Sequence, residues 1–387
     1  MKIRKWIILL VLLGACKEKF VVEVKTPSAG YLVVEGFINI SGTTNIILTR
    51  SSGIDTPRYI PEPGAEVDIQ MQGGGNFVLS EDYVGHYTIG GLNLDPTQQY
   101  RLHIQTAYGK EYVSDYSVVK ITPPIDSVNW TGTTNSVTGN QINIFVSTHD
   151  DQTQPGYYQW QFEETWKYSS QYGSQIEYQS GSRSFLRLDL RPVEDGIYYC
   201  WKSDQSTTIN IANTEKLSAN VIYQYPLTQI SYSTSDKLIK RYSILVKQYA
   251  LTSEWYEWNQ KIKKNTEQLG SIFDAQPSQT GGNIHSVSDP EETVIGFVGC
   301  TTETDQRIFI DRSEIPNGSI PSGYEFCQMD TVLPVQADVD MAYQSGANIP
   351  VNFYEKNHVL VGILGSTAEC VDCRVKGGTT VEPPFWK

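Results

Sequence analysis

The sequence predicts a mainly β protein with two domains, and three observations support this prediction. First, the 387 residues include 24 Tyr and 12 Phe, and aromatic residues are enriched in strands. Second, apolar and polar residues alternate with a period of two in many short segments, and turn residues separate these segments. Third, the chain is longer than one sandwich or barrel usually needs, so two domains are expected.

Residues 1–15 predict an export signal that is removed. Three basic residues precede an apolar run from Trp6 to Leu13, which is too short to cross a membrane as a helix. The run ends in Leu-Gly-Ala-Cys16, which resembles the lipobox of bacterial lipoproteins, where the cysteine is diacylated and becomes the new N-terminus. We therefore expect lipidation of Cys16, and the alternative is an ordinary cleaved signal. Two or more acyl chains suffice for stable membrane attachment.

The charge of the chain argues against binding nucleic acid. The predicted leader carries three positive charges and no acidic residue, so its removal changes the net charge from −13 to −16. Such a chain is not attracted to nucleic acid or to anionic lipids through bulk charge, so the lipid is the expected anchor. Residues 16–30 predict a polar tether. Its start, Lys17-Glu18, is faintly similar to the surface-export signal of Bacteroidota lipoproteins. The expected location is therefore the cell outer membrane, on either its periplasmic face or its cell-surface face.

Residues 31–123 predict a small β-sandwich. Alternating stretches such as Ala65 to Gln70 and Tyr100 to Gln105 are separated by turns that contain Gly or Pro. The order Pro-Gly-Ala-x-Val, Gly-x-Tyr and Tyr-x-Leu-x-Ile resembles the prealbumin-like, Ig-like sandwich of carboxypeptidase regulatory domains. His86 and His103 flank core positions on the opposite face, so they are expected to face solvent.

Residues 124–387 predict a larger β-rich domain with one amphipathic helix. Two adjacent prolines at positions 123 and 124 favour an extended connector, so the boundary is expected there. In the stretch from Tyr158 to Glu163, aromatic residues occupy one face, and Gln159, Gln161 and Glu163 the other. A helix is expected over residues 253–269, because polar residues can cap its start and apolar residues recur at helical spacing.

The cysteines predict two structural disulfides. Cys370-x-x-Cys373 is compatible with a redox pair, half of a zinc site or two disulfide ends. A thioredoxin-like pattern is absent, and only the distant Cys200 and Cys327 remain as further zinc ligands. The oxidising compartment of an exported protein favours disulfides among these four residues. The three possible pairings stay open, Cys300 is expected to be free and buried, and the bridges would staple a Cys-rich C-terminal tail.

The sequence contains no motif that would predict an enzyme. Nucleophile-elbow, zinc-helix and phosphate-loop motifs are absent, so we expect no cofactor and no metal site. His149-Asp150-Asp151 combines an imidazole with two carboxylates, although such residues in turns usually cap the backbone. Glycosidase carboxylates need not be close in sequence, so a hydrolase stays a less favoured alternative. Trp160, Trp166 and Trp201 are candidates for ligand or interface contacts, while most other aromatic residues are expected in the core.

Several segments together resemble a family of Bacteroidota lipoproteins that is catalogued only as a domain of unknown function. They are Ser147–Asp150, Arg241–Arg312, Cys370–Arg374 and Pro384–Trp386. Members of this family are typically encoded beside TonB-dependent receptors, so the resemblance implies an outer-membrane lipoprotein that assists such a transporter and captures its ligand. It implies no reaction. The alternative is an independent surface lipoprotein that binds glycan or protein.

Overall fold

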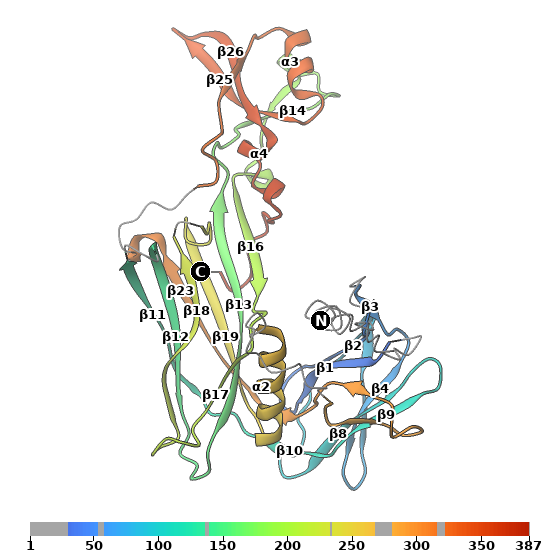
Figure 1. Ribbon diagram of the computed structural model, residues 1–387. Coiled ribbons are helices and arrows are strands. Elements are labelled where there is room, and N and C mark those ends of the chain that lie inside the picture. The colour runs from blue at the N-terminus through green and yellow to red at the C-terminus, as the bar shows by residue number, and fades with distance from the viewer. Residues whose placement is uncertain are drawn as a thin grey trace, which may run out of the picture.

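The computed structural model describes residues 30–52, 58–135, 139–232, 234–267, 281–315 and 322–386. The expected leader, Cys16 and the tether up to residue 29 lie outside these residues. The fold is mainly β, which confirms the predicted class. Figure 1 shows an N-terminal sandwich, a central sandwich and a small head that projects from the far end of the central sandwich. In the parts of the chain described, no helix is both long and apolar enough to cross a membrane.

The N-terminal sandwich is built mainly from the first ten strands. β1 runs antiparallel to β2, and β4 runs antiparallel to β8. Its core contains the buried side chains of Leu32, Val67, Tyr87 and Tyr100. The strands are β1 (Leu32–Asn39), β2 (Thr44–Arg50), β3 (Ile60–Pro61), β4 (Glu66–Met71), β5 (Asn76–Val78), β6 (Ser80–Tyr83), β7 (His86–Ile89), β8 (Gln99–Gln105), β9 (Glu111–Ser114) and β10 (Ser117–Lys120).

Three late strands complete the N-terminal sandwich, so it extends beyond the expected range of 31–123. β20 (Ile284–Ser286) pairs with β9, and β21 (Val294–Ile295) pairs with β1. β22 (Cys300–Thr301) lies parallel to both β1 and β10. Cys300 is therefore buried, and it is the free cysteine among the described residues. The proline connector marks the place where the chain first leaves this sandwich, and residues 284–301 return to it.

The central sandwich packs two sheets around an aromatic core. One sheet has the order β11-β12-β18, and the other has the order β16-β13-β19-β23, with β17 beside β13. The core between them includes Trp160, Phe162, Tyr242 and Ile310. The strands are β11 (Ile125–Asn135), β12 (Gly139–His149), β13 (Tyr157–Ser169), β16 (Tyr199–Gln205), β17 (Asn210–Asn213), β18 (Val221–Ser231), β19 (Arg241–Ala250) and β23 (Glu303–Asp311).

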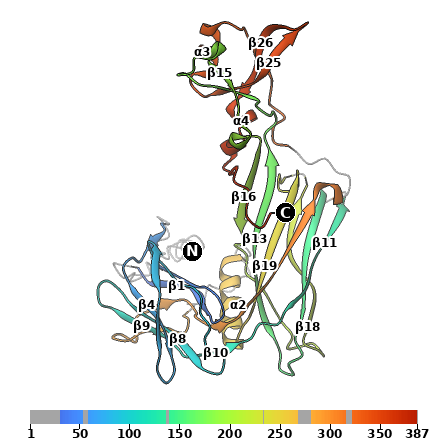
Figure 2. The ribbon, with the colours of Figure 1, turned by 180° about the vertical axis from the view of Figure 1, so that it is seen from behind.

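The head, residues 170–198 and 322–372, is inserted between β13 and β16 and completed by the C-terminal part of the chain. The view from behind in Figure 2 shows the same separation of the head from the N-terminal sandwich. A small core of Ile176, Leu188, Val339 and Ile363 holds it together. Its strands and α-helices are β14 (Ile176–Tyr178), β15 (Leu188–Leu190), β24 (Asp330–Val332), β25 (Asn348–Lys356), β26 (Val359–Thr367), α3 (Gln336–Tyr343) and α4 (Ala368–Val371). Short 3-10 turns occupy η1 (Phe185–Arg187), η2 (Val193–Asp195), η3 (Arg312–Glu314) and η4 (Cys373–Lys376).

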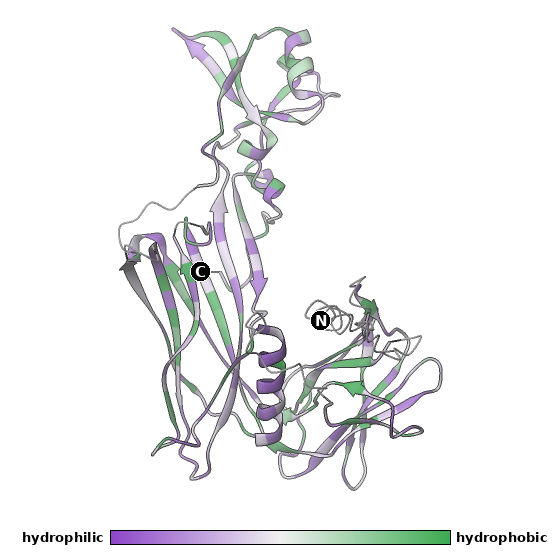
Figure 3. Ribbon diagram, in the orientation of Figure 1, coloured by the Kyte–Doolittle hydropathy of each residue, from purple (hydrophilic) through white to green (hydrophobic). Residues whose placement is uncertain are grey.

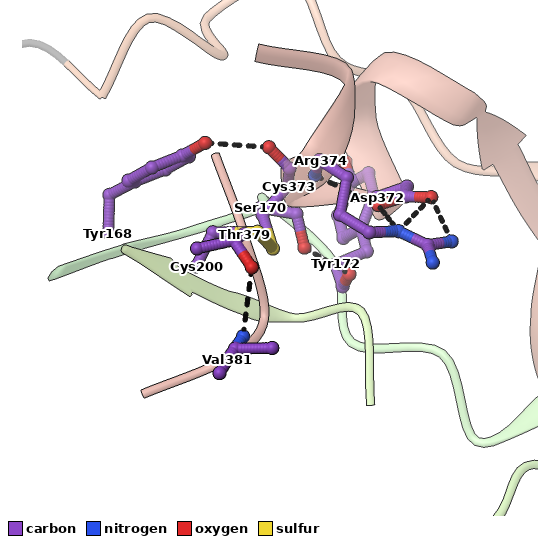
Figure 4. Close-up of a disulfide and its surroundings, with 9 residues drawn as sticks. All are labelled: Tyr168, Ser170, Tyr172, Cys200, Asp372, Cys373, Arg374, Thr379 and Val381. Atoms are coloured by element: carbon purple, nitrogen blue, oxygen red, sulfur yellow. Dashed lines mark hydrogen bonds and ion pairs between the residues drawn. A yellow bond between two sulfur atoms is a disulfide. The ribbon is translucent and has the colours of Figure 1, made fainter. Parts of the chain in front are cut away.

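Two disulfides form among the four predicted cysteines: one joins the end of the head to the central sandwich, and the other lies within the head. Cys200 in β16 bonds to Cys373, and Cys327 bonds to Cys370, so the structure selects one of the three possible pairings. Beside the first bridge the Tyr168 hydroxyl donates to the Cys373 carbonyl at 2.7 Å (Figure 4). The tail then runs along β16, where Trp201 and Thr379 exchange backbone hydrogen bonds. The C-terminal tail is thus stapled to the edge of the second sheet.

Candidate functional site

A cleft of about 710 Å³ lies between the two sandwiches. One wall is the outer face of the second sheet of the central sandwich, and the opposite wall is formed by β1 and β2. Helix α2 (Ser253–Glu267) closes one side, and residues 295–297 contribute to the lining. α2 begins at the predicted residue, where the Trp255 backbone N–H donates to the Thr252 hydroxyl at 3.2 Å. Residues 268 and 269, where this helix was expected to end, lie outside the described range.

The polar face of β13 forms the sheet wall of the cleft. Gln159, Gln161 and Glu163 all line it, while the aromatic residues between them point into the core. The alternating pattern of this stretch is therefore confirmed, and its polar residues face a cavity rather than open solvent. Neighbouring strands add further polar lining residues, which are Gln205 of β16, Lys247 and Tyr249 of β19, and Glu303 of β23. In β19 the Lys247 ammonium lies 2.7 Å from a carboxylate oxygen of Glu163.

A second pair of interacting side chains lies on the same wall of the cleft. The Tyr249 hydroxyl in β19 donates to the Glu303 carboxylate in β23 at 2.8 Å. Burial, followed by the negative charge of Glu303, raises the pKa of Tyr249, so the hydroxyl stays protonated and donates. This hydrogen bond holds the Glu303 side chain in place at the lining of the cleft.

An aromatic cluster fixes the two sandwiches relative to each other. Trp255 of α2 lies 5.8 Å from Phe37 of β1 and 6.3 Å from Phe297, measured between ring centroids. Phe37 also packs on Tyr249 at 4.6 Å. Gly299 lies so close to the indole that a Cβ atom there would be 2.3 Å from it. Most of α2 is hydrophilic (Figure 3), and its buried Tyr256 also packs on Tyr157 of β13 at 5.4 Å between ring centroids. Aromatic contacts therefore attach α2 to both sandwiches, and the cleft is preformed.

The lining of the cleft is acidic and carries polar groups without partners. Glu35, Glu163 and Glu303 supply three carboxylates, and Lys247 supplies the single ammonium of the lining. Among the residues that the structure describes, no hydrogen bond or ion pair engages the side chains of Glu35, Gln161 or Gln205. These side chains are free to bind a ligand, because they give up no existing contact.

The three tryptophans predicted to contact a ligand or partner are buried, so that prediction is wrong. Trp160 stacks on Tyr225 at 4.7 Å and donates its indole N–H to Gln248 at 2.8 Å. Trp166 is buried in the core of the central sandwich. Trp201 is covered by the C-terminal tail, where Trp386 packs edge-on against it at 6.3 Å. Trp160 and Trp166 are buried because they belong to the core of the central sandwich, and Trp201 is buried because the tail covers it.

The lining of the cleft contains other aromatic residues, namely Phe37, Phe162, Tyr249, Trp255, Trp258 and Phe297. Helical spacing alone places Trp258 on the packing face of α2, since it lies three residues after Trp255. Its half-buried ring is also part of the lining. The sequence of the helix cannot distinguish packing from cleft lining, because the cleft exists only where β1 lies opposite the helix in the folded protein.

Three of the histidines, His103, His149 and His285, lie within ion-pair distance of carboxylates. His149 lies 2.7 Å from Asp126, and this hydrogen bond raises its pKa. Asp150 accepts a hydrogen bond from the Gln152 backbone, as expected for a turn residue. In the described parts of the chain, no group of three or more His, Cys, Asp or Glu side chains is arranged to hold a metal ion.

His103 is mostly buried, which contradicts the expectation that it faces solvent. Its ring lies between two carboxylates, 2.6 Å from Asp68 and 3.0 Å from Glu111. Asp68 is itself buried in β4. The exposed-face prediction is wrong here because β4 and β9, on either side of β8, bring Asp68 and Glu111 against the ring.

The head carries several exposed apolar side chains, which are together called the head surface below. Its exposed side chains include Val193, which is 95% exposed, and Met341, which is 80% exposed. Leu186 and Arg187 adopt left-handed backbone conformations, with φ of 58° and 55°. This strained turn buries Leu186 in the head core and leaves Phe185 exposed. The other exposed apolar residues of this head surface are Leu190, Phe326, Leu333, Val335, Tyr354 and Val359.

A comparison with protein families identifies the chain. The family described as "Domain of unknown function (DUF4249)" matches residues 17–307. The chain belongs to this family. All residues that line the cleft, from Val33 to Glu303, fall within the matched part of this DUF4249 protein.

Other comparisons add little to the family assignment. No curated protein matches the DUF4249 chain. One similar solved structure is the crystal structure of the chicken interferon gamma receptor alpha chain. It is 9% identical, has a TM-score of 0.16, and the match covers 57% of this chain and 90% of that chain. This similarity is too low to establish a common fold.

Proposed function

We propose that this DUF4249 protein is a Bacteroidota outer-membrane lipoprotein that captures a ligand for a TonB-dependent transporter. The observation that carries the proposal is the preformed cleft, whose lining includes polar side chains without partners. The leader and the Leu-Gly-Ala-Cys16 sequence support attachment through a lipid on Cys16.

The chemistry of the cleft favours binding over hydrolysis. A glycosidase needs one carboxylic acid kept protonated opposite a second carboxylate. Glu163 instead forms an ion pair with Lys247, and Glu303 accepts a hydrogen bond from the Tyr249 hydroxyl, so both carboxylates already have partners within the wall. The cleft therefore presents fixed negative charges, which suit a binding site.

The head surface supports contact with a second protein. Large contiguous apolar patches mark protein contacts, and we propose that the exposed apolar side chains of the head form such a patch. The disulfide between Cys200 and Cys373 joins the head to β16, so a partner bound at the head would be held against the central sandwich. The transporter is the proposed partner at this surface.

Affinity isolation of the lipidated protein from native membranes, followed by mass spectrometry, tests the proposal. A TonB-dependent transporter is expected in the isolate after gentle detergent extraction. Met341→Asp should reduce its amount, because the charge enters the head surface, whereas Tyr108→Asp on the exposed N-terminal sandwich should not. Repeated isolation of the protein alone would overturn the proposal. Affinity for a polysaccharide panel without any receptor would instead support an independent glycan-binding lipoprotein.

Two further measurements test the anchor. Cys16→Ser should abolish labelling by fatty acid and release the protein from the membrane. Protease accessibility on intact cells should then distinguish the periplasmic face from the cell surface.

A further inference from the structure

We infer that the cleft binds an extended peptide segment that carries lysine or arginine. This inference rests on the proposed role of the cleft in ligand capture and adds the chemical class of the ligand. Three properties of the lining support it, namely its charge, its aliphatic surface and its free amides.

The charge of the lining selects a cationic ligand. Three carboxylates face the cleft, and the only lysine among the lining residues is already paired with one of them. Glu35 has no partner in the described residues and lies on β1, opposite the sheet wall. A phosphate, nucleotide or acidic glycan would meet net negative potential here, whereas an ammonium or guanidinium group would be attracted.

The apolar part of the lining suits amino-acid side chains. Ile47, Ile209, Ile262 and Ile295 line the cleft together with the rings of Trp258 and Phe297. Sugars present hydroxyl groups on most of their surface, so four isoleucines would leave many of those hydroxyls unpaired. The long apolar stem of a lysine or arginine can pack on this surface while its charged end reaches a carboxylate or an aromatic face.

Free amide side chains suit the main chain of a peptide. Gln161 and Gln205 line the sheet wall, and Asn45 of β2 lines the opposite wall. Each amide offers both a donor and an acceptor, which matches the alternating N–H and C=O groups of an extended peptide. The cavity volume of about 710 Å³ falls within the range of about 300–1,000 Å³ for small-ligand sites, so it accommodates a short segment.

Peptide titration of the full-length protein tests this inference. The probes are end-blocked peptides of sequence Gly-Lys-Leu-Lys-Gly, Gly-Gln-Leu-Gln-Gly and Gly-Glu-Leu-Glu-Gly, measured by isothermal titration calorimetry at low and high salt. The lysine peptide should bind about tenfold more tightly than the glutamate peptide, and added salt should reduce this difference.

A matched pair of variants locates the binding site. Glu35→Lys should weaken binding of the lysine peptide about fivefold, because it reverses a charge that faces the cleft. Glu66→Lys makes the same change at an exposed strand residue of the same sandwich, outside the lining, and should have no effect. Both glutamates lack partners among the described residues, so neither variant is expected to unfold the protein.

Two outcomes would overturn the inference. One is equal affinity for the three peptides, including no binding of any of them. The other is an equal effect of Glu35→Lys and Glu66→Lys. Either result is separable from failure of the proposed function, since a transporter that still co-isolates with the protein would leave the accessory role in place and exclude only this ligand class.

Discussion

Replacement of Trp255 should most directly weaken the contact between the two sandwiches. Its side chain is 4% exposed, and it contacts aromatic rings from β1 and from the segment that returns to the N-terminal sandwich. Trp255→Ala removes the ring that connects α2 to both. The backbone of the helix should persist, because alanine is the strongest helix former.

The expected loss is large compared with the stability of a domain. Replacement of a buried Trp by Ala typically costs about 3–5 kcal/mol, whereas whole domains are stable by only about 5–15 kcal/mol. Because the ring lies between two bodies, part of this loss should appear as separate unfolding of the sandwiches. Gly299→Val should act in the same direction, since any Cβ at that position meets the Trp255 ring.

Urea unfolding followed by circular dichroism measures both effects. The matched control is Trp258→Ala on the same helix, where the ring is only half-buried and the expected loss is about 1–2 kcal/mol. Hydrogen exchange of β1 and α2 should report faster opening in Trp255→Ala than in the control. A single cooperative transition within about 1 kcal/mol of the unmodified protein would refute the reasoning.

Two further predictions concern the head and the N-terminal sandwich. Replacement of Cys200 and Cys373 by serine should lower the free energy of unfolding by about 5 kcal/mol, because the bridge closes a separation of 173 residues. Urea midpoints should show a larger loss than for the Cys327 and Cys370 pair, and the reverse order would contradict this. Burial lowers the pKa of His103, but Asp68 and Glu111 outweigh it and raise the pKa above 6.5. Stability from protonated His103 is therefore complete below about pH 6.5 and is lost as the pH rises through the folded-state value. His103→Gln should flatten the fall in melting temperature between about pH 6 and pH 8, and an unchanged pH profile would exclude this role.

Local patterns in the sequence predicted the mainly β class, the start of α2 and the four bonded cysteines. These features depend on period-two alternation, on helical spacing and on the number of cysteines. The polar face of β13 was also predictable, because Gln159 and Gln161 alternate with aromatic residues. The same alternation places Trp160 inside, so its assignment as a contact residue conflicted with information already in the sequence.

The cleft and the head depend on non-local pairing, which the sequence does not reveal. Residues 284–301 return to a sandwich that the chain leaves near residue 124, and this return brings Phe297 against Trp255. The head combines β14 and β15 with strands that come more than 130 residues later. β14, β15, β20, β21, β22 and β24 have only two or three residues each, so their own patterns are weak. Lipidation of Cys16 stays a prediction, because this residue lies outside the described range.

Site-specific photocrosslinking in living cells tests the central claim most directly, namely that the cleft captures a ligand for a transporter. A benzophenone amino acid replaces Gln161 in the cleft, or Tyr108 on the exposed N-terminal sandwich as a control. Mass spectrometry after illumination should find basic peptides attached at position 161 but not at position 108, and more of them in cells that lack the transporter. Absence of any adduct at position 161, or the same adducts at both positions, would contradict the account.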